Sequence, residues 1–173
     1  MLSGNVITDD RSSAVGFEGD RNPFRNNRIQ RAAAAGVNFR GRGNQITRNV
    51  VTDIPAFAPG FGIDFSGGDD RIAGNQTSRT LNQAIRLNVF ENETASTAHR
   101  TTVVGKRGQR AGTVGIAIST DFEGSGTIDG TFISGNAVIA AGADGIQVVS
   151  PGATLKRTSS PAIPCMAARP WPG

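Results

Sequence analysis

Hydrophobic positions recur along the chain with a period of 22 to 26 residues. Three segments align on a Val or Ile followed two positions later by Phe: Ala14–Phe17, Gly36–Phe39 and Gly62–Phe65. A second apolar position follows nine residues after each Val or Ile, and a third anchor follows five residues later, at Ile29, Val51 and Thr77. Apolar and polar residues alternate around each anchor, which is the period of a strand with one buried face.

Three short strands within one period cannot pair with one another, because a turn follows each of them at once. Each strand can pair with its equivalent one period later, which predicts an all-β solenoid of rungs about 4.8 Å apart, with three parallel sheets around a narrow apolar core. The repeat continues through Gly115, Ile133 and Gly145, with Leu155 as a late second anchor. The pattern does not assign the strands of residues 94–115. One inward column is expected after the first anchors: Phe17, Phe39, Phe65, Leu87, Ile118 and Val148.

Polar residues also repeat. An asparagine stands two positions before the third anchor in several copies, which predicts an inward ladder of amides that bond to corner backbone groups and to each other: Asn27, Asn49, Asn75 and Asn136. Asn22, Asn44 and Asp70 stand two positions before the second anchor. Aligned glycines indicate a corner that requires a positive φ: Gly19, Gly41 and Gly67.

The G-[VI]-x-F and N-x-[IV] units resemble those of the right-handed parallel β-helix superfamily, the pectate-lyase-like fold, over residues 4–155. The resemblance implies a right-handed, single-stranded parallel β-helix of about six to seven rungs, as a stacked repeat. Many members of that superfamily bind or cleave polysaccharides. Others are phage tail spikes, adhesins or periplasmic accessory proteins.

The expected domain organisation is a β-helix over 1–155 and a Pro-rich tail over 156–173, whose prolines are incompatible with ladder strands and which is either a cap or a disordered extension. The repeat starts close to Met1, which favours a fragment of a longer coil or an edge covered by another subunit, and thus end-to-end or lateral self-association. No secretory signal is present. Localisation is open, and it is extracellular or periplasmic if the chain is part of an exported protein.

Two insertions are expected at one corner, between a third anchor and the next first anchor. The first lies within 54–61, and the second, longer and basic, runs from His99 to Arg110. Such loops would form a lip over the adjacent first sheet, and loops on a rigid scaffold often carry binding residues. Phe57 and Phe61 either offer rings to a sugar face or plug the loop onto the coil.

The outward positions of this first sheet follow from strand alternation. One column reads Gly16, Asn38, Asp64 and Arg86, and the next reads Glu18, Arg40, Ser66 and Asn88, with Arg42 in the turn. A mixture of acids, Arg and Asn suits an acidic polysaccharide, or it forms cross-strand ion pairs that contribute little when exposed. The predicted substrate-binding residues are Asn38, Arg40, Arg42, Phe57, Phe61, Asp64 and Arg86.

The amino-acid composition limits the classes of partner that the protein is expected to bind. The net charge of +4 comes from 16 Arg and two Lys against 14 acids, and Arg suits carboxylate, sulfate or phosphate groups. The same excess is also typical of a solvated Arg-rich surface. The basic residues are interrupted by acids and lack an aromatic-rich motif, so nucleic acid is not the expected partner. No apolar run is long enough to span a membrane, and a single cysteine, Cys165, excludes a disulfide framework or a multi-cysteine metal cage.

No complete catalytic set emerges, although the resemblance implies a lyase or epimerase relative. The weak catalytic candidates are Asp64, Asp69, Arg40, Arg86 and His99. Asp69-Asp70 resembles the paired aspartates of polygalacturonases, but that family's other motifs are absent. A pectate-lyase-like site would use acidic Ca²⁺ ligands and a basic proton acceptor, and Arg is a poor base. We expect no dedicated cofactor or metal, with Ca²⁺ the one open case. The alternative function is a non-catalytic structural or interaction module.

Overall fold

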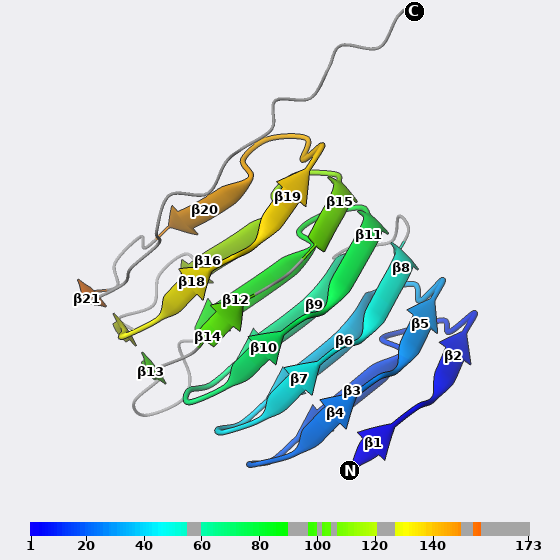
Figure 1. Ribbon diagram of the computed structural model, residues 1–173, viewed down its shortest axis with the longest axis horizontal. Coiled ribbons are helices and arrows are strands. Elements are labelled where there is room, and N and C mark those ends of the chain that lie inside the picture. The colour runs from blue at the N-terminus through cyan, green and yellow to red at the C-terminus, as the bar shows by residue number, and fades with distance from the viewer. Residues whose placement is uncertain are drawn as a thin grey trace, which may run out of the picture.

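The computed structural model describes residues 1–54, 60–89, 97–99, 102–104, 107–120, 127–149 and 154–156. Within these ranges the protein is all-β, and three six-stranded parallel sheets wrap around one core as stacked coils (Figure 1). The sequence prediction of a parallel β-solenoid with three sheets is therefore confirmed. Its right-handedness and its number of rungs stay predictions. In the part of the chain that is described, no helix could span a membrane.

The three sheets, called A, B and C here, each take one strand from every successive coil. Sheet A contains β1 (Leu2–Ser3), β4 (Pro23–Arg25), β7 (Gln45–Thr47), β10 (Arg71–Ala73), β14 (Thr102–Val104) and β18 (Phe132–Ser134). Sheet B contains β2 (Val6–Thr8), β5 (Arg28–Gln30), β8 (Val50–Ile54), β11 (Gln76–Thr80), β15 (Arg107–Ala111) and β19 (Ala137–Ile139). Sheet C contains β3 (Val15–Glu18), β6 (Ala35–Arg40), β9 (Phe61–Ser66), β12 (Ile85–Val89), β16 (Ile116–Thr120) and β20 (Ile146–Val149).

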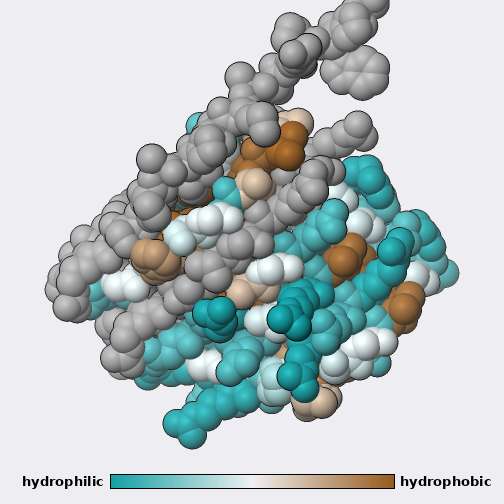
Figure 2. All heavy atoms as spheres, viewed as in Figure 1, coloured by the Kyte–Doolittle hydropathy of each residue, from teal (hydrophilic) through white to brown (hydrophobic). Residues whose placement is uncertain are grey.

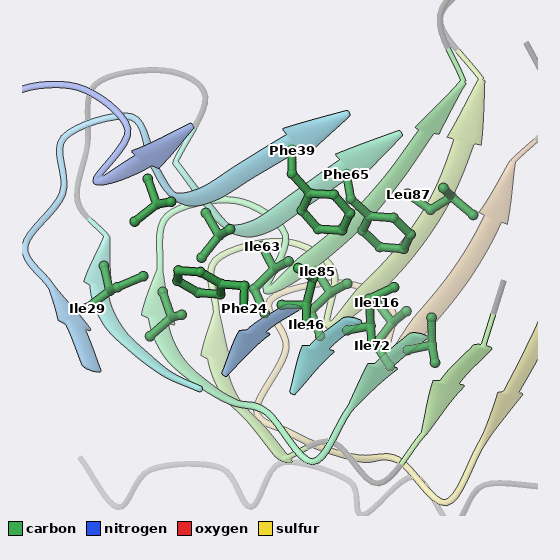
Figure 3. Packing of buried hydrophobic residues seen from close by; sticks show 14 of the residues in the cluster. Phe24, Ile29, Phe39, Ile46, Ile63, Phe65, Ile72, Ile85, Leu87 and Ile116 are labelled. Carbon is green, nitrogen blue, oxygen red and sulfur yellow. The ribbon is translucent and has the colours of Figure 1, made fainter. Parts of the chain in front are cut away.

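The predicted inward column lies in sheet C in the expected register. Phe17 pairs with Phe39, Phe39 with Phe65, and Phe65 with Leu87, and the column continues through Ile118 and Val148. The rings of Phe17 and Phe39 stack with centroids 5.3 Å apart, and those of Phe39 and Phe65 stack at 5.4 Å. Figure 3 shows Phe39, Phe65 and Leu87 side by side above Ile46 and Ile72 of sheet A. A one-residue slip would turn this column outward, so the stack fixes the register.

The asparagine ladder is also confirmed. The Asn27 Nδ2 donates to Asn49 Oδ1 at 3.0 Å, and the Asn49 Nδ2 donates to Asn75 Oδ1 at 2.9 Å. Asn5 extends the ladder through its own Nδ2, which lies 2.8 Å from Asn27 Oδ1. Further along, the buried Asn136 donates from Nδ2 to the Val103 carbonyl at 3.0 Å. Each amide thus serves polar groups that a corner would otherwise leave unpaired inside the coil.

The placement of the second, basic insertion was wrong. Residues 102–104 and 107–111 are strands in register with sheets A and B, and the connection from β15 to β16 is short. The longer excursion lies between sheets C and A, where β13 (Thr97–His99), β17 (Thr127–Asp129) and β21 (Thr154–Lys156) form a fourth, three-stranded sheet. The sequence pattern did not reveal the strand at 107–111, because Gly108 occupies the register position of the inward Thr77. Leu155, expected in sheet A, instead pairs with Ile128 in the fourth sheet.

Candidate functional site

Sheet C brings four of the nine predicted site residues onto one outer face: Asn38, Arg40, Asp64 and Arg86. Parallel pairing aligns Gly16, Asn38, Asp64 and Arg86 in one column. The next outward column aligns Glu18 with Arg40 and Arg40 with Ser66. The candidate residues on these strands therefore stand one rung from their neighbours, as alternation along the strands predicts.

Asp64 and Arg86 form a closed ion pair within this face. The Arg86 Nε lies 2.8 Å from Asp64 Oδ1 and its Nη2 lies 2.9 Å from Oδ2, so both carboxylate oxygens accept a bond. The Arg86 guanidinium also lies 3.9 Å from the centroid of the Phe61 ring, which supports it from beneath. Phe61 is 4% exposed and belongs to β9, so its ring is packed under Arg86 and is not presented on the surface.

A hollow of about 430 Å³ opens on the same face at the first rungs, lined by Ser13, Gly16, Phe17, Glu18, Asn38 and Arg40. Gly16 lines it, and a Cβ placed there would meet no atom within 4 Å. The Arg40 Nη1 and the Glu18 Oε1 in its lining are 3.9 Å apart, and both side chains are well exposed. The wall therefore offers a guanidinium, a carboxylate and an amide to solvent around an empty outward position.

The corner after sheet C holds Arg42 and Asp69. The Arg42 Nη2 lies 3.5 Å from Asp69 Oδ2, and the Arg42 backbone N–H donates to Asp20 Oδ1 at 2.7 Å. Asp70, the next residue after Asp69, points inward and is 1% exposed. Its Oδ1 accepts the Asn44 backbone N–H at 2.7 Å. Asp69 therefore lies at the surface corner. Asp70 belongs to a second polar ladder, formed by Asn22, Asn44 and Asp70.

Burial raises the pKa of Asp70 to about 7, against the lowering effect of its hydrogen bonds from Asn44. The carboxyl is enclosed by the coil, so this titration concerns the core of the solenoid and not a surface reaction. Its Oδ2 has no hydrogen-bond partner in the structure. A protonated acid fits this position better than a carboxylate, since an unpaired buried charge is costly.

Two predicted site residues are not placed relative to the hollow. Phe57 lies outside the described residues. His99 ends β13 in the fourth sheet, and its side chain lies outside the described part. Among the residues that the structure describes, no group of three or more His, Cys, Asp or Glu side chains could hold a metal ion. Both carboxylate oxygens of Asp64 already accept hydrogen bonds from Arg86.

A column of alternating charge follows sheet B and was not anticipated. Asp9, Arg31, Asp53 and Arg79 occupy equivalent positions at the end of the sheet, Asp53 and Arg79 within β8 and β11, and each has φ between 52° and 60°. Arg31 donates to both oxygens of Asp9, and Arg79 donates to both oxygens of Asp53. These bonds from arginine lower the pKa of Asp9 to about 2 and that of Asp53 to about 2. The signal available in the sequence was the 22- and 26-residue spacing of these four residues.

A groove over sheet A was also missed. It measures about 560 Å³ and is lined by Arg25, Asn26, Thr47, Arg48, Arg71, Ala73 and Gly74. Along the chain, Arg25 and Arg48 are among the basic residues that acids interrupt, which hides their clustering. The coil instead separates them from those acids, because residues adjacent in sequence turn onto different sheets.

No family model matches the chain, and neither the curated proteins nor the solved structures include a significant match. The fold is therefore identified by its own strand pairing and polar ladders. What the protein binds has to be inferred from the chemistry of its surface.

Proposed function

We propose that the protein binds an acidic polysaccharide on the outer face of sheet C, as a right-handed β-helix of the pectate-lyase-like kind. The observation that carries the proposal is the hollow lined by Gly16, Asn38, Arg40 and Glu18, in which the Gly16 position has open space in front of it. A guanidinium matches the planar carboxylate of a uronate, and an amide and a carboxylate can bond to sugar hydroxyls.

The geometry of the strands suits an extended chain. Outward residues repeat at about 4.8 Å from rung to rung, so a polymer lying across the rungs meets Glu18, Arg40 and Ser66 in succession. The face of the molecule seen in Figure 2 is largely hydrophilic over the described residues. Modification of the bound chain by lyase or epimerase chemistry is not part of the proposal, because Asp64 is committed to Arg86.

Calorimetric titration with oligogalacturonate and oligoalginate tests the proposal directly. Gly16→Trp should fill the hollow and reduce affinity, whereas Gly16→Ala adds one methyl group to open space and should reduce it little. Arg40→Gln should weaken binding by about tenfold, the equivalent of one charge-assisted hydrogen bond. Unchanged affinity in both Gly16→Trp and Arg40→Gln would rule out this face.

The alternative function, a non-catalytic structural or interaction module, is favoured by the Asp64–Arg86 pair. That pair satisfies both charges within the sheet and leaves them unavailable to a ligand. A protein of this kind would show no affinity for either oligosaccharide in the same titration. The two functions are therefore separated by one measurement on the unmodified chain.

A further inference from the structure

The groove over sheet A carries a concentrated positive charge. Arg25 lies on β4, Arg71 lies on β10, and Arg48 follows β7, so the three come from three neighbouring coils and line one depression. All three side chains are exposed. None of the described strands of sheet A contains Asp or Glu.

Several other arginines along the described sheets are paired with acids, in contrast to these three. Each of five arginines faces an acid within 4 Å, namely Arg31, Arg40, Arg42, Arg79 and Arg86. Within the described ranges no carboxylate lies at that distance from Arg25, Arg48 or Arg71. Arg25 contacts Met1 Sδ at 3.4 Å, and a thioether is a weak acceptor that leaves the charge in place. The groove thus keeps about three positive charges that the protein itself does not neutralise.

The backbone holds the groove open. Arg25, Thr47 and Ala73 line it from one outward column on successive rungs, and Gly74 follows Ala73. Arg48 adopts φ 56°, and its backbone N–H donates to the Ala73 carbonyl at 3.0 Å. The backbone position from which the Arg48 side chain extends is therefore fixed before any ligand binds. This reduces the entropic cost of ordering that side chain on binding.

We propose that this groove binds a small ligand bearing two or more phosphate or sulfate groups. Guanidinium forks bond to such tetrahedral oxyanions in pairs, and several unneutralised arginines around one depression favour a multiply charged ligand. The volume of about 560 Å³ suits a ligand the size of a substituted disaccharide. None of the groove's lining residues is aromatic, so the surface lacks the stacking platform on which single-stranded nucleic acids depend. The groove lies over sheet A, whereas the hollow beside Gly16 that is proposed to bind a uronate lies on sheet C. The groove proposal therefore does not depend on the proposed function.

Calorimetric titration of the full chain at low ionic strength tests this site. The probes are inorganic pyrophosphate, a trisulfated disaccharide and the same disaccharide without sulfate. The groove variant is R25Q/R48N/R71Q, in which Asn is chosen at position 48 because it tolerates a positive φ. A matched control, R11Q/R21N/R28Q, removes the same charge from exposed arginines outside the groove, including one at φ 57°.

We expect both charged probes, or one of them, to bind the unmodified protein, and the uncharged disaccharide not to bind. Affinity should fall by about tenfold or more for each groove arginine removed, and much less in the control. Preference for pyrophosphate or for the sulfated sugar identifies the group that the groove takes. If the triple variant does not fold, R71Q alone gives the same comparison against R28Q.

Three results would overturn the site: no binding of either charged probe, equal losses in the groove variant and the control, or tighter binding of a short single-stranded oligonucleotide that displaces both probes. None of these results tests the hollow beside Gly16 on sheet C. That site is tested separately, by titrating the Gly16 and Arg40 variants with carboxylate-bearing chains.

Discussion

The Arg86 guanidinium holds both carboxylate oxygens of Asp64 from the neighbouring rung, at 2.8 and 2.9 Å. Only 19% of the Arg86 side chain and 7% of the Asp64 side chain are exposed. The pair therefore sits where water screens it weakly, between the ring of Phe61 and the surface. In such a place, the loss of one partner costs more than the intact pair contributes, because the other charge stays buried.

Arg86→Met should therefore destabilise the protein by about 3 kcal/mol, because it leaves the Asp64 carboxylate unpaired. The double variant D64N/R86M should recover much of that loss, since no buried charge remains. Urea denaturation of the two single variants and the double variant gives the coupling free energy. Additive losses would show that the two side chains act independently, contrary to their geometry.

The exposed pair between Arg31 and Asp9 provides the matched comparison. Its geometry is equally two-pronged, but 48% and 61% of the two side chains are exposed. Arg31→Met should change the free energy of unfolding far less than Arg86→Met, because solvent screens the remaining carboxylate. Equal losses in the two variants would show that burial does not set the strength of these pairs.

Asn49 is bonded to both of its neighbours in the asparagine ladder. Its Oδ1 accepts from the backbone N–H and the Nδ2 of Asn27, and its own Nδ2 donates to Asn75 and to the Phe24 carbonyl. Asn49→Ala should cost about 3 kcal/mol or more, because several buried polar groups lose their partners together. Thermal and urea unfolding measure it, with the exposed sheet A residue Gln45→Ala as control. A loss no larger than the control's would mean that water replaces the amide.

Gly67 and Gly16 form a matched pair of glycines. Gly67 has φ 127°, and a Cβ there would lie 1.7 Å from the Gly41 carbonyl oxygen, whereas a Cβ at Gly16 meets nothing within 4 Å. Gly67→Ala should destabilise by about 2 kcal/mol or more through strain at the corner. Gly16→Ala should be neutral or slightly stabilising. Similar unfolding midpoints for the two variants would contradict the close stacking of the corners.

Sequence periodicity predicted the part of the fold whose repeats carry apolar residues and asparagines at recurring positions. The Phe17, Phe39 and Phe65 column and the Asn27, Asn49 and Asn75 ladder lie in the predicted register, since each repeat carries its own signal. The strands of 102–111 were missed because Gly108 stands where an inward side chain was sought. The fourth sheet has only three short strands and no anchor motif, so nothing in the periodicity marked it.

For the candidate site, the sequence predicted the positions of residues on the strands but not the contacts between their side chains. Alternation placed Asn38, Asp64 and Arg86 in one outward column, but it could not show that Asp64 and Arg86 close on each other. The groove arginines escaped notice because a linear scan mixes Arg25 and Arg48 with acids that the coil carries to other faces. Charge separation between sheets becomes visible only once residues are grouped by sheet and not by distance along the chain.

Asp70 should make stability depend on pH near neutrality. Its pKa is about 7 in the folded protein against an ordinary value of 3.8, so the folded state binds the proton more tightly than the unfolded state. Stability should therefore fall as pH rises from about 4 to about 7, by roughly 2 to 4 kcal/mol in total for this group. Asp70→Asn keeps an oxygen that can accept the Asn44 N–H and removes the titration.

Urea denaturation from pH 4.5 to pH 8 checks this dependence, and Asp70→Asn should flatten the curve and be most stabilising at the alkaline end. Glu18→Gln, at an exposed carboxylate on sheet C, is the control and should keep the slope of the unmodified protein. A slope that persists in Asp70→Asn would assign the titration to another group. Destabilisation by Asp70→Asn at pH 8 would show that the folded protein prefers a carboxylate in the second ladder, and would overturn the view of Asp70 as a buried neutral acid.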